Sequence, residues 1–372
     1  MKKDKQRESR SMDIINNKYS EPLAWVKFAL NPGEELPTIT NWRVIFDFCD
    51  KQKIGGICEP TRFDIHVEDV VLLDWMALLM QLRKSNSVLN KRVIDYFTQL
   101  ESDGLRCCLL KGQGNATLYP DPMMRLPGDI DVWIDLDKKS IDEYFTNLYP
   151  EAKQSFKHLK VYNGDTPVDI HDTPLKLYNP FHHKRLQKWL EENKHEQFSH
   201  RVNLTEDKYA VCIPTPKFNA VYQMGHIMLH LLDEGIGLRH FVDYYYVLKH
   251  LGDLCDRDKQ EIVYTWESTG MSKLASGVIW IEHEVLGLPK EFLLTEPNER
   301  RGKLLLEDIL EGGNFGKESK RFGLARKGIL SKGIVLGLHN IKLYSLYPAE
   351  IPYKLIAKIK TFIKYITNVS IR

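Results

Sequence analysis

The sequence lacks an apolar run that approaches the roughly 18 residues of a membrane-spanning helix. The N-terminal stretch MKKDKQRESRSMDIINNKYSE is charged and has no apolar centre, so we expect no secretory signal peptide. The chain also has little excess charge, because its formal net charge is +2. Nothing global therefore demands a nucleic-acid or membrane partner, and we expect a soluble protein that is at most peripherally attached to a membrane.

The sequence also lacks paired cysteines of the C-x-x-C type. The six cysteines are scattered at Cys49, Cys58, Cys107, Cys108, Cys212 and Cys255. Their spacing argues against a zinc ribbon or a disulfide scaffold and favours reduced thiols in a cytoplasmic protein. Internal repeats and low-complexity tracts are absent as well. With 43% hydrophobic and 27% charged residues, the composition is that of an ordinary soluble protein with a substantial core.

Hydrophobic periodicity divides the chain into four parts. Residues 1–104 are predicted to be an N-terminal helical segment, with apolar residues at three and four spacing over 68–100. Residues 105–214 alternate between strand and helix patterns and are predicted to form an α/β core of about 110 residues. Residues 215–316 are predicted to be a C-terminal helical lobe, and residues 317–372 a basic helical tail. The expected fold class is α+β, a small mixed sheet flanked by helical segments.

Within the core, the order of elements is β-α-β-α-β-β. RCCLLKG is a short strand, and the helix after it ends before Pro120 and Pro122. DIDVWIDL is predicted to be a strand, and KKSIDEYFTNLYPE a helix. SFKHLKVYNG and TPVDIHD are two strands around a turn at Asn163-Gly164. In the C-terminal lobe, helical periodicity covers residues 215–233, 237–251, 257–268 and 271–287, followed by a glycine-rich break, GGNFG, at 312–316.

The motif GDIDVWI puts two aspartates into an otherwise apolar, strand-forming stretch. Successive side chains of a strand alternate between faces, so Asp129 and Asp131 share one face, and Ile130 and Val132 share the other. Two adjacent ionised carboxylates repel each other and are costly to bury unless a cation lies between them. The pattern favours a divalent metal site, and Mg²⁺, or Mn²⁺ in its place, is the expected ion because Mg²⁺ is typically bound by one or two carboxylates together with phosphate oxygens.

The stretch TPVDIHD offers a third carboxylate. Asp169 and His171 share one face of the predicted strand. If this strand neighbours the first acidic strand, both side chains converge with the two aspartates there. Three carboxylates around metal ions suit phosphoryl transfer, in which the third can accept the proton of an attacking hydroxyl. An isolated D-x-D pair is a weak motif that also occurs on exposed strand faces and in turns, so the interpretation depends on the strands being neighbours.

Positively charged side chains should accompany such a site, because a nucleoside triphosphate substrate would carry several negative charges. Lys111 and Gly112 end one strand and open the next helix, where backbone N–H groups favour phosphate. Arg125 lies in the loop that leads to the aspartate strand and can be interpreted as a phosphate clamp.

LLKGQGNATLYPDPMMRLPGDIDVWID, followed by VDIH, resembles the nucleotidyltransferase superfamily of the DNA polymerase β type. Within it, the sequence is most similar to a bacterial group of uncharacterised nucleotidyltransferases found among polysaccharide and surface-biosynthesis genes. The resemblance spans roughly residues 70–320 and includes HIMLHLLDEGIGLRHFVDYYYVL and GGNFG. It implies metal-dependent transfer of a nucleoside monophosphate from an NTP to a hydroxyl of a sugar, a glycan precursor or another small molecule.

By position, the resemblance makes Asp129, Asp131 and Asp169 the catalytic and metal-binding residues. The residues that it assigns to nucleotide binding are Lys111, Gly112, Gln113, Arg125, Gly128, His171 and Arg239. The sequence departs from the superfamily in one place, where Gly112-Gln113 replaces the usual Gly-Gly or Gly-Ser. The departure concerns triphosphate binding and leaves the metal ligands intact.

Two patterns in the C-terminal lobe leave alternatives open. HIMLH places His226 and His230 one helical turn apart, a spacing that can bind zinc, but it lacks the glutamate of H-E-x-x-H. The pair can instead pack beside the nucleotide cleft or line it. Arg239 and Asp243 are also four residues apart. They can form an ordinary helix salt bridge, or Arg239 can face the site with Asp243 orienting it.

Residues 317–372 hold twelve Lys and Arg against two Glu, with apolar residues between them. The tail can be a solvated face of terminal helices, or it can contact an anionic membrane or nucleic acid. Two alternatives to nucleotidyl transfer also remain open. One is a metal-dependent phosphohydrolase that uses the same carboxylates with water as the acceptor. The other is a catalytically idle protein that binds nucleotide or acts as a scaffold.

Overall fold

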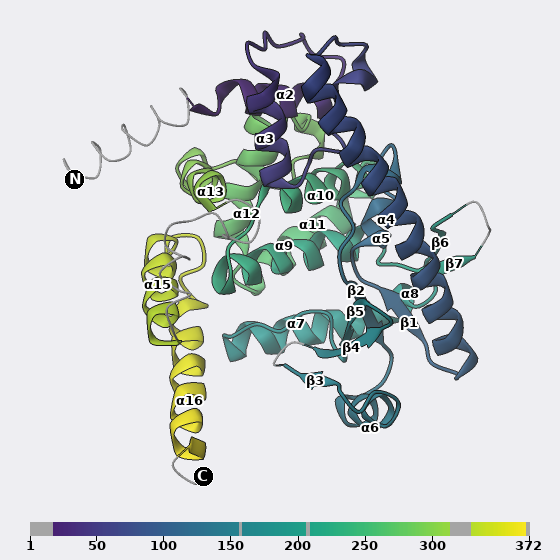
Figure 1. Ribbon diagram of the computed structural model, residues 1–372. Helices are drawn as coiled ribbons and strands as arrows, with labels where there is room; N and C mark the ends of the chain where they lie inside the picture. The colour runs from purple at the N-terminus through teal and green to yellow at the C-terminus, as the bar shows by residue number, and fades with distance from the viewer. Residues whose placement is uncertain (1–17, 156–157, 206–208, 313–328, 370–372) are drawn as a thin grey trace, which may run out of the picture.

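The computed structural model describes residues 18–155, 158–205, 209–312 and 329–369 (Figure 1). Residues 313–316 of the predicted glycine-rich break and residues 317–328 and 370–372 of the predicted basic tail lie outside these ranges. The elements from the N-terminus to the central sheet are α2 (Ser20–Leu30), α3 (Trp42–Gln52), η1 (Pro60–Phe63) and α4 (Asp69–Ser102). The long α4 confirms the helix predicted over residues 68–100.

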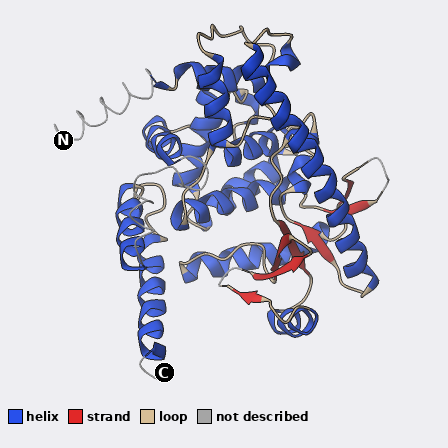
Figure 2. Cartoon of the chain, viewed as in Figure 1, coloured by secondary structure: helices blue, strands red, loops and turns tan. Residues whose placement is uncertain are grey.

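The central region alternates strands and helices in the predicted order, with one additional short strand before the predicted hairpin (Figure 2). Its elements are β1 (Cys107–Leu109), α5 (Gln113–Ala116), η2 (Pro122–Met124), β2 (Ile130–Ile134), α6 (Lys138–Leu148), β3 (Lys153–Gln154), β4 (Leu159–Asn163) and β5 (Thr166–His171). No element was predicted in the next stretch, which contains α7 (Pro180–Glu192), α8 (Lys194–Gln197), β6 (Arg201–Asn203) and β7 (Ala210–Cys212).

The remaining elements are helical. They are α9 (Pro216–Asp233), α10 (Leu238–Lys249), α11 (Asp256–Ser268), α12 (Ser272–Trp280), the π-helical turn η3 (Ile281–Val285), η4 (Lys290–Phe292), α13 (Glu299–Gly312), α15 (Ile329–Lys342) and α16 (Ile351–Val369). The four helices predicted between residues 215 and 287 are confirmed. Among the described residues, no helix has both the length and the apolar character needed to cross a bilayer.

The five-stranded sheet is mixed and has the order β1-β2-β5-β4-β3. β2 and β5 are parallel neighbours, whereas the other adjacent pairs are antiparallel. The predicted turn between β4 and β5 contains Gly164, whose φ of 60° suits glycine in a tight hairpin. The predicted α+β class with a small mixed sheet is confirmed.

The two faces of the sheet have different roles, because side chains alternate along each strand. Val132 and Ile170 point to one face and pack with Val93 and Phe97 of α4 and with Phe145 of α6. On the opposite face, the indole of Trp133 stacks on Phe218 of α9 with ring centroids 5.6 Å apart. The helical region therefore covers the face that carries Asp131 and Asp169.

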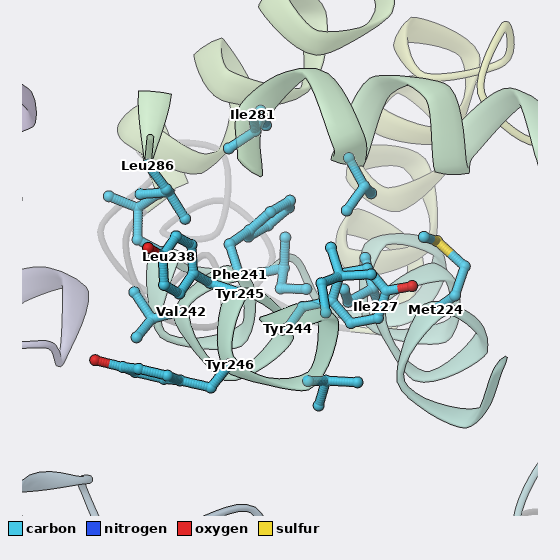
Figure 3. Packing of buried hydrophobic residues seen from close by; sticks show 14 of the residues in the cluster. Met224, Ile227, Leu238, Phe241, Val242, Tyr244, Tyr245, Tyr246, Ile281 and Leu286 are labelled. Carbon is cyan, nitrogen blue, oxygen red and sulfur yellow. The ribbon is translucent and has the colours of Figure 1, made fainter. Parts of the chain in front are cut away.

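The helices before and after the sheet in sequence share one apolar core. This cluster includes Trp25 and Trp75 from the N-terminal segment and Phe241 and Trp266 from the C-terminal helices. Figure 3 shows its centre, where side chains of α10 pack against Ile281, Leu286 and α9. The N-terminal helices and the C-terminal lobe are thus packed together as one helical body, and the C-terminal half of α4 extends from it onto the opposite face of the sheet.

Candidate active site

Three carboxylates meet where β2 and β5 run side by side. The parallel register pairs Asp131 with Asp169 and Trp133 with His171. Asp129 lies just before β2 and adds a third acid on the same side. One oxygen from each of these aspartates lies within 4.8 Å of the others. The strands are therefore neighbours, as the sequence analysis required, and the three carboxylates could hold a divalent cation.

Asp131 is the most buried of the three acids, with 1% of its surface exposed. Its Oδ1 lies 3.1 Å from the Lys111 Nζ and 3.1 Å from the His171 Nε2. Burial alone would raise the pKa of the Asp131 carboxyl, but Lys111 and His171 outweigh it and hold that pKa well below its usual range. Its Oδ2 is buried without a hydrogen-bond partner among the described residues. An orphaned anionic oxygen of this kind suits a metal ligand.

Asp169 has a different environment. Its Oδ1 lies 3.1 Å from the Lys160 Nζ, and its Oδ2 lies 3.3 Å from the His158 Nε2. Burial, together with the negative charges of Asp131 and Asp129, raises the pKa of Asp169 to about 6. Lys160 and His158 were not predicted as site residues. Strand alternation in the sequence could have indicated Lys160, because β4 pairs it directly with Asp169.

Lys111 and Gly112 lie at the end of β1, next to the carboxylates. Although burial opposes it, the charges of Asp131 and Asp129 raise the pKa of Lys111, which therefore remains a cation. Gly112 has φ 59°, and a Cβ there would lie 3.3 Å from the carbonyl oxygen of Asp129. Glycine thus lets the two segments approach each other closely. By contrast, a Cβ at Gly128 would meet nothing within 4 Å.

Gln113, which was predicted to bind nucleotide, lies in a buried amide network. Its Nε2 donates to the Oδ1 of Asn86, 3.2 Å away, and to the Oδ1 of Asn90. The Asn86 Nδ2 in turn donates to the carbonyl oxygens of Met123 (2.8 Å) and Arg125 (2.9 Å). These hydrogen bonds connect α4 to the loop that enters β2. No sequence pattern marks the two asparagines, since they lie on a helix with ordinary periodicity.

Arg125 forms a buried, bidentate ion pair with Asp243. The Arg125 Nε and Nη2 each lie 2.8 Å from one Asp243 oxygen, and the Tyr119 hydroxyl donates to the same carboxylate at 2.6 Å. Burial would raise the pKa of Asp243, but Arg125 holds it below its ordinary value. The spacing of Arg239 and Asp243 left open a helix salt bridge or an Arg239 oriented by Asp243, and the structure adds a further partner for Asp243 in the loop before β2. The pair anchors that loop to α10.

Arg239 lies one turn before Asp243, at the start of α10. The pKa of Arg239 lies below its ordinary value, because burial and the nearby charge of Arg125 outweigh the opposing charges of Asp243 and Asp129. Its guanidinium is therefore close enough to Asp129 to interact electrostatically with the acidic cluster. That Arg239 faces the site and binds nucleotide stays a prediction.

The histidines of HIMLH lie beside a third histidine that the sequence analysis did not connect with them. His226 and His230 on α9 meet His240 on α10, with one nitrogen of each within 4.8 Å of the others. Burial, together with the charges of His230 and Arg239, lowers the pKa of His240 well below its ordinary value. No local sequence pattern places His240 near His226 and His230, because its proximity to them depends on the turn between α9 and α10.

The sequence profile of a family described as uncharacterised nucleotidyltransferase matches residues 40–287 of the chain, which is more than half of its length. The chain belongs to this family. Membership in the uncharacterised nucleotidyltransferase family supports a general role in nucleotidyl transfer, and the matched range includes all three carboxylates and the three histidines. No curated protein matches the chain significantly.

One solved structure is similar to part of the chain. It is an antigenic nucleotidyltransferase-like protein from Paracoccidioides brasiliensis, with 13% sequence identity and a TM-score of 0.27. The match covers 50% of this chain and 91% of that one. A similarity at this level does not bear on the substrates of the present chain.

Proposed function

We propose that this member of the uncharacterised nucleotidyltransferase family is a metal-dependent enzyme that transfers a nucleoside monophosphate from an NTP to a hydroxyl group. The acceptor is a sugar, a glycan precursor or another small molecule. Placement in the DNA polymerase β-type superfamily and a bacterial origin are part of the same proposal. The motifs GDIDVWI and VDIH, together with family membership, support it.

One observation carries the proposal, the convergence of Asp129, Asp131 and Asp169 from two parallel strands. The residues fit a divalent cation, because carboxylate oxygens are the ligands that Mg²⁺ and Mn²⁺ prefer and the Asp131 Oδ2 has no other described partner. Once bound, the cation would supply charge neutralisation and polarisation at the phosphates. The basic groups around the acids would share the task of binding triphosphate.

In the proposed reaction the chain positions groups and moves a proton. The acceptor oxygen forms a bond to the α-phosphorus, and the bond from that phosphorus to the bridging oxygen of the departing pyrophosphate breaks. The hydroxyl proton passes to Asp169, the carboxylate that lies across from Asp131 in the strand register. Lys111 and Arg239 provide positive charge for the triphosphate, with His171 and Gly128 beside it. Gln113 and Arg125 hold the loops that carry these residues.

A cytoplasmic location belongs to the same proposal, and the absence of disulfides among the six cysteines supports it. The division of the chain at residues 104, 214 and 316 also stays a proposal. Contact of the basic tail with an anionic membrane is a further prediction. Leu355, Ile356 and Ile359 are exposed on α16 beside its lysines, a pattern typical of interfacial helices.

The test uses NTPs labelled at the α-phosphate, incubated with the protein, Mg²⁺ or Mn²⁺, and an extract fraction as the source of acceptor. We expect label on an acceptor with the wild type and none with Asp129→Asn. The matched control is Asp142→Asn, which removes an acid on α6. The surface ion pair of Asp142 with Lys138 contributes little to stability. Label released only as free nucleotide or phosphate would indicate hydrolysis. No NTP binding in the presence of either metal would favour an idle protein.

A further inference from the structure

Three histidines form a cluster beside the carboxylate site that the proposed reaction does not use. His226 and His230 lie one turn apart on α9, and His240 lies in the first turn of α10. The Nε2 atoms of His226 and His230 are 3.0 Å apart. The His240 ring lies 5.0 Å from the His230 ring and 6.0 Å from the His226 ring, measured between centroids. One nitrogen from each imidazole therefore points to a common centre.

The turn between α9 and α10 builds this arrangement. Gly235 takes φ 104° and donates its N–H to the carbonyl oxygen of His230 at 2.8 Å, which ends α9. Gly237 then precedes α10, so only two residues, Leu238 and Arg239, lie between Gly237 and His240. A reversal this tight returns His240 to the face of α9 that carries the other two histidines.

We propose that His226, His230 and His240 bind one transition-metal ion of the zinc type, at a site separate from the three carboxylates. Imidazole is a preferred ligand of Zn²⁺ and its neighbours in the first transition series, whereas Mg²⁺ prefers oxygen. A tetrahedral ion with Zn–N bonds of about 2.0–2.1 Å places its ligand nitrogens about 3.4 Å apart. The observed separations, from 3.0 Å to at most 4.8 Å, require only small side-chain rotations to reach that value.

The surroundings of the cluster resemble those of histidine ligands in proteins. Metal-bound imidazoles generally direct their second nitrogen toward a carboxylate or a carbonyl, which fixes the ring orientation. The His230 Nδ1 lies 3.7 Å from the Glu234 carboxylate, while its Nε2 faces His226. The Tyr222 ring stacks against His226 at 6.0 Å and supports that ring from the side. Three protein ligands leave a fourth position for water or another small ligand.

The site would hold the start of α10 in place. His240 directly follows Arg239, and Asp243 lies one turn later, so an ion that ties His240 to α9 also positions the residues that anchor the nucleotide site. The inference does not rest on the proposed transfer reaction. Metal binding by the histidines can be measured in a protein whose carboxylate site is filled or disabled.

The experiment is a titration of tag-free, metal-free protein with Zn²⁺ in excess Mg²⁺, followed by calorimetry, with Co²⁺ absorption as a second readout. We expect one equivalent to bind and the Co²⁺ spectrum to indicate nitrogen ligands. His226→Ala and His240→Ala should each weaken Zn²⁺ binding by more than about 100-fold, because even loss of a ligand's outer partner costs about 10–100-fold. Glu234→Gln should weaken it by about tenfold.

Two variants serve as controls. His195→Ala removes an exposed histidine on α8, and Asp129→Asn disables the carboxylate site, so both should bind Zn²⁺ as the wild type does. Circular dichroism would show whether each variant is folded, and half-buried His226 gives a readout even if His240→Ala does not fold. A wild type that takes up no Zn²⁺ in excess Mg²⁺ overturns the proposal. Unchanged affinity in His226→Ala does the same and leaves the cluster as a hydrogen-bonded histidine pair with a neighbour.

Discussion

Asp131 on β2 and Asp169 on β5 lie directly opposite each other in the register of two parallel strands. Each acid has a lysine of its own, Lys111 for Asp131 and Lys160 for Asp169, at 3.1 Å in both cases. The repulsion between the carboxylates is therefore balanced by two separate cations that come from β4 and from the end of β1. These lysines offset part of the negative charge of the acidic cluster.

Replacing Lys111 with methionine should destabilise the protein in a metal-dependent way. The change leaves the buried Asp131 carboxylate with His171 as its remaining close partner, so we expect a loss of about 3 kcal/mol in metal-free buffer, near the lower end for breaking a buried ion pair. A divalent cation at the carboxylates would replace the missing charge. Urea unfolding in EDTA and in Mg²⁺ should show that Mg²⁺ increases the free energy of unfolding more in the variant than in the wild type. Equal gains would contradict a metal site at Asp131.

The acidic cluster could be predicted because strand alternation is a local property. Once residues 129–134 and 166–171 are assigned as strands, the faces of Asp131 and Asp169 follow from a period of two. Only their adjacency had to be assumed, and the parallel β2–β5 pairing supplies it. Lys160 was predictable by the same rule, since it lies opposite Asp169 in the antiparallel pairing of β4 with β5.

Other relationships depend on tertiary contacts that no local pattern encodes. Asp243 has a plausible partner four residues away in Arg239, yet its carboxylate binds Arg125, which is 118 positions earlier. His240 reaches the HIMLH pair only through the α9–α10 turn. The strands β6 and β7 have three residues each, too few for an alternation to stand out from a loop.

The ion pair between Arg125 and Asp243 should contribute strongly to stability. Both side chains are about 5% exposed, so Asp243→Ala leaves a buried guanidinium uncompensated. We expect the free energy of unfolding to fall by about 3–5 kcal/mol. The matched control is Asp74→Ala, which removes the partner of Arg43 in an ion pair that is more than a third exposed and should cost less than about 1 kcal/mol. Similar losses for the two variants, measured by urea denaturation, would contradict this assignment.

Gly56 should not tolerate a side chain, because it packs against the segment that leads to Arg125. A Cβ at Gly56 would lie 2.1 Å from the carbonyl oxygen of Met124 and 2.9 Å from the Leu82 Cδ1. The backbone of η2 would have to move, so Gly56→Ala should cost about 1–3 kcal/mol. At Gly33 a Cβ would meet nothing within 4 Å, and Gly33→Ala should leave the melting temperature almost unchanged. If both variants have the same melting temperature, the close approach of Gly56 to Met124 does not affect the stability of the protein.

Glu282 should make the protein less stable as the pH rises. Its side chain is fully buried in η3, and neither carboxylate oxygen has a hydrogen-bond partner among the described residues. Burial raises the pKa of Glu282 well above its ordinary value of 4.5. The folded protein therefore holds this proton at a pH where the unfolded chain has lost it. Between the unfolded and folded pKa values, the free energy of unfolding falls by about 1.4 kcal/mol per pH unit from this group.

Glu282→Gln removes the titrating proton while keeping the shape of the side chain. Below the pKa of the unfolded chain, both proteins are neutral at this position and should be similarly stable. As the pH rises toward 8, the free energy of unfolding of the variant should become larger than that of the wild type. The control, Glu284→Gln, changes an exposed acid two residues away and should show no such divergence. Urea unfolding of all three proteins at about pH 4.5, 6 and 8 gives the three curves. Parallel curves for the Glu282→Gln variant and the wild type would show that Glu282 ionises in the folded protein as readily as in the unfolded chain.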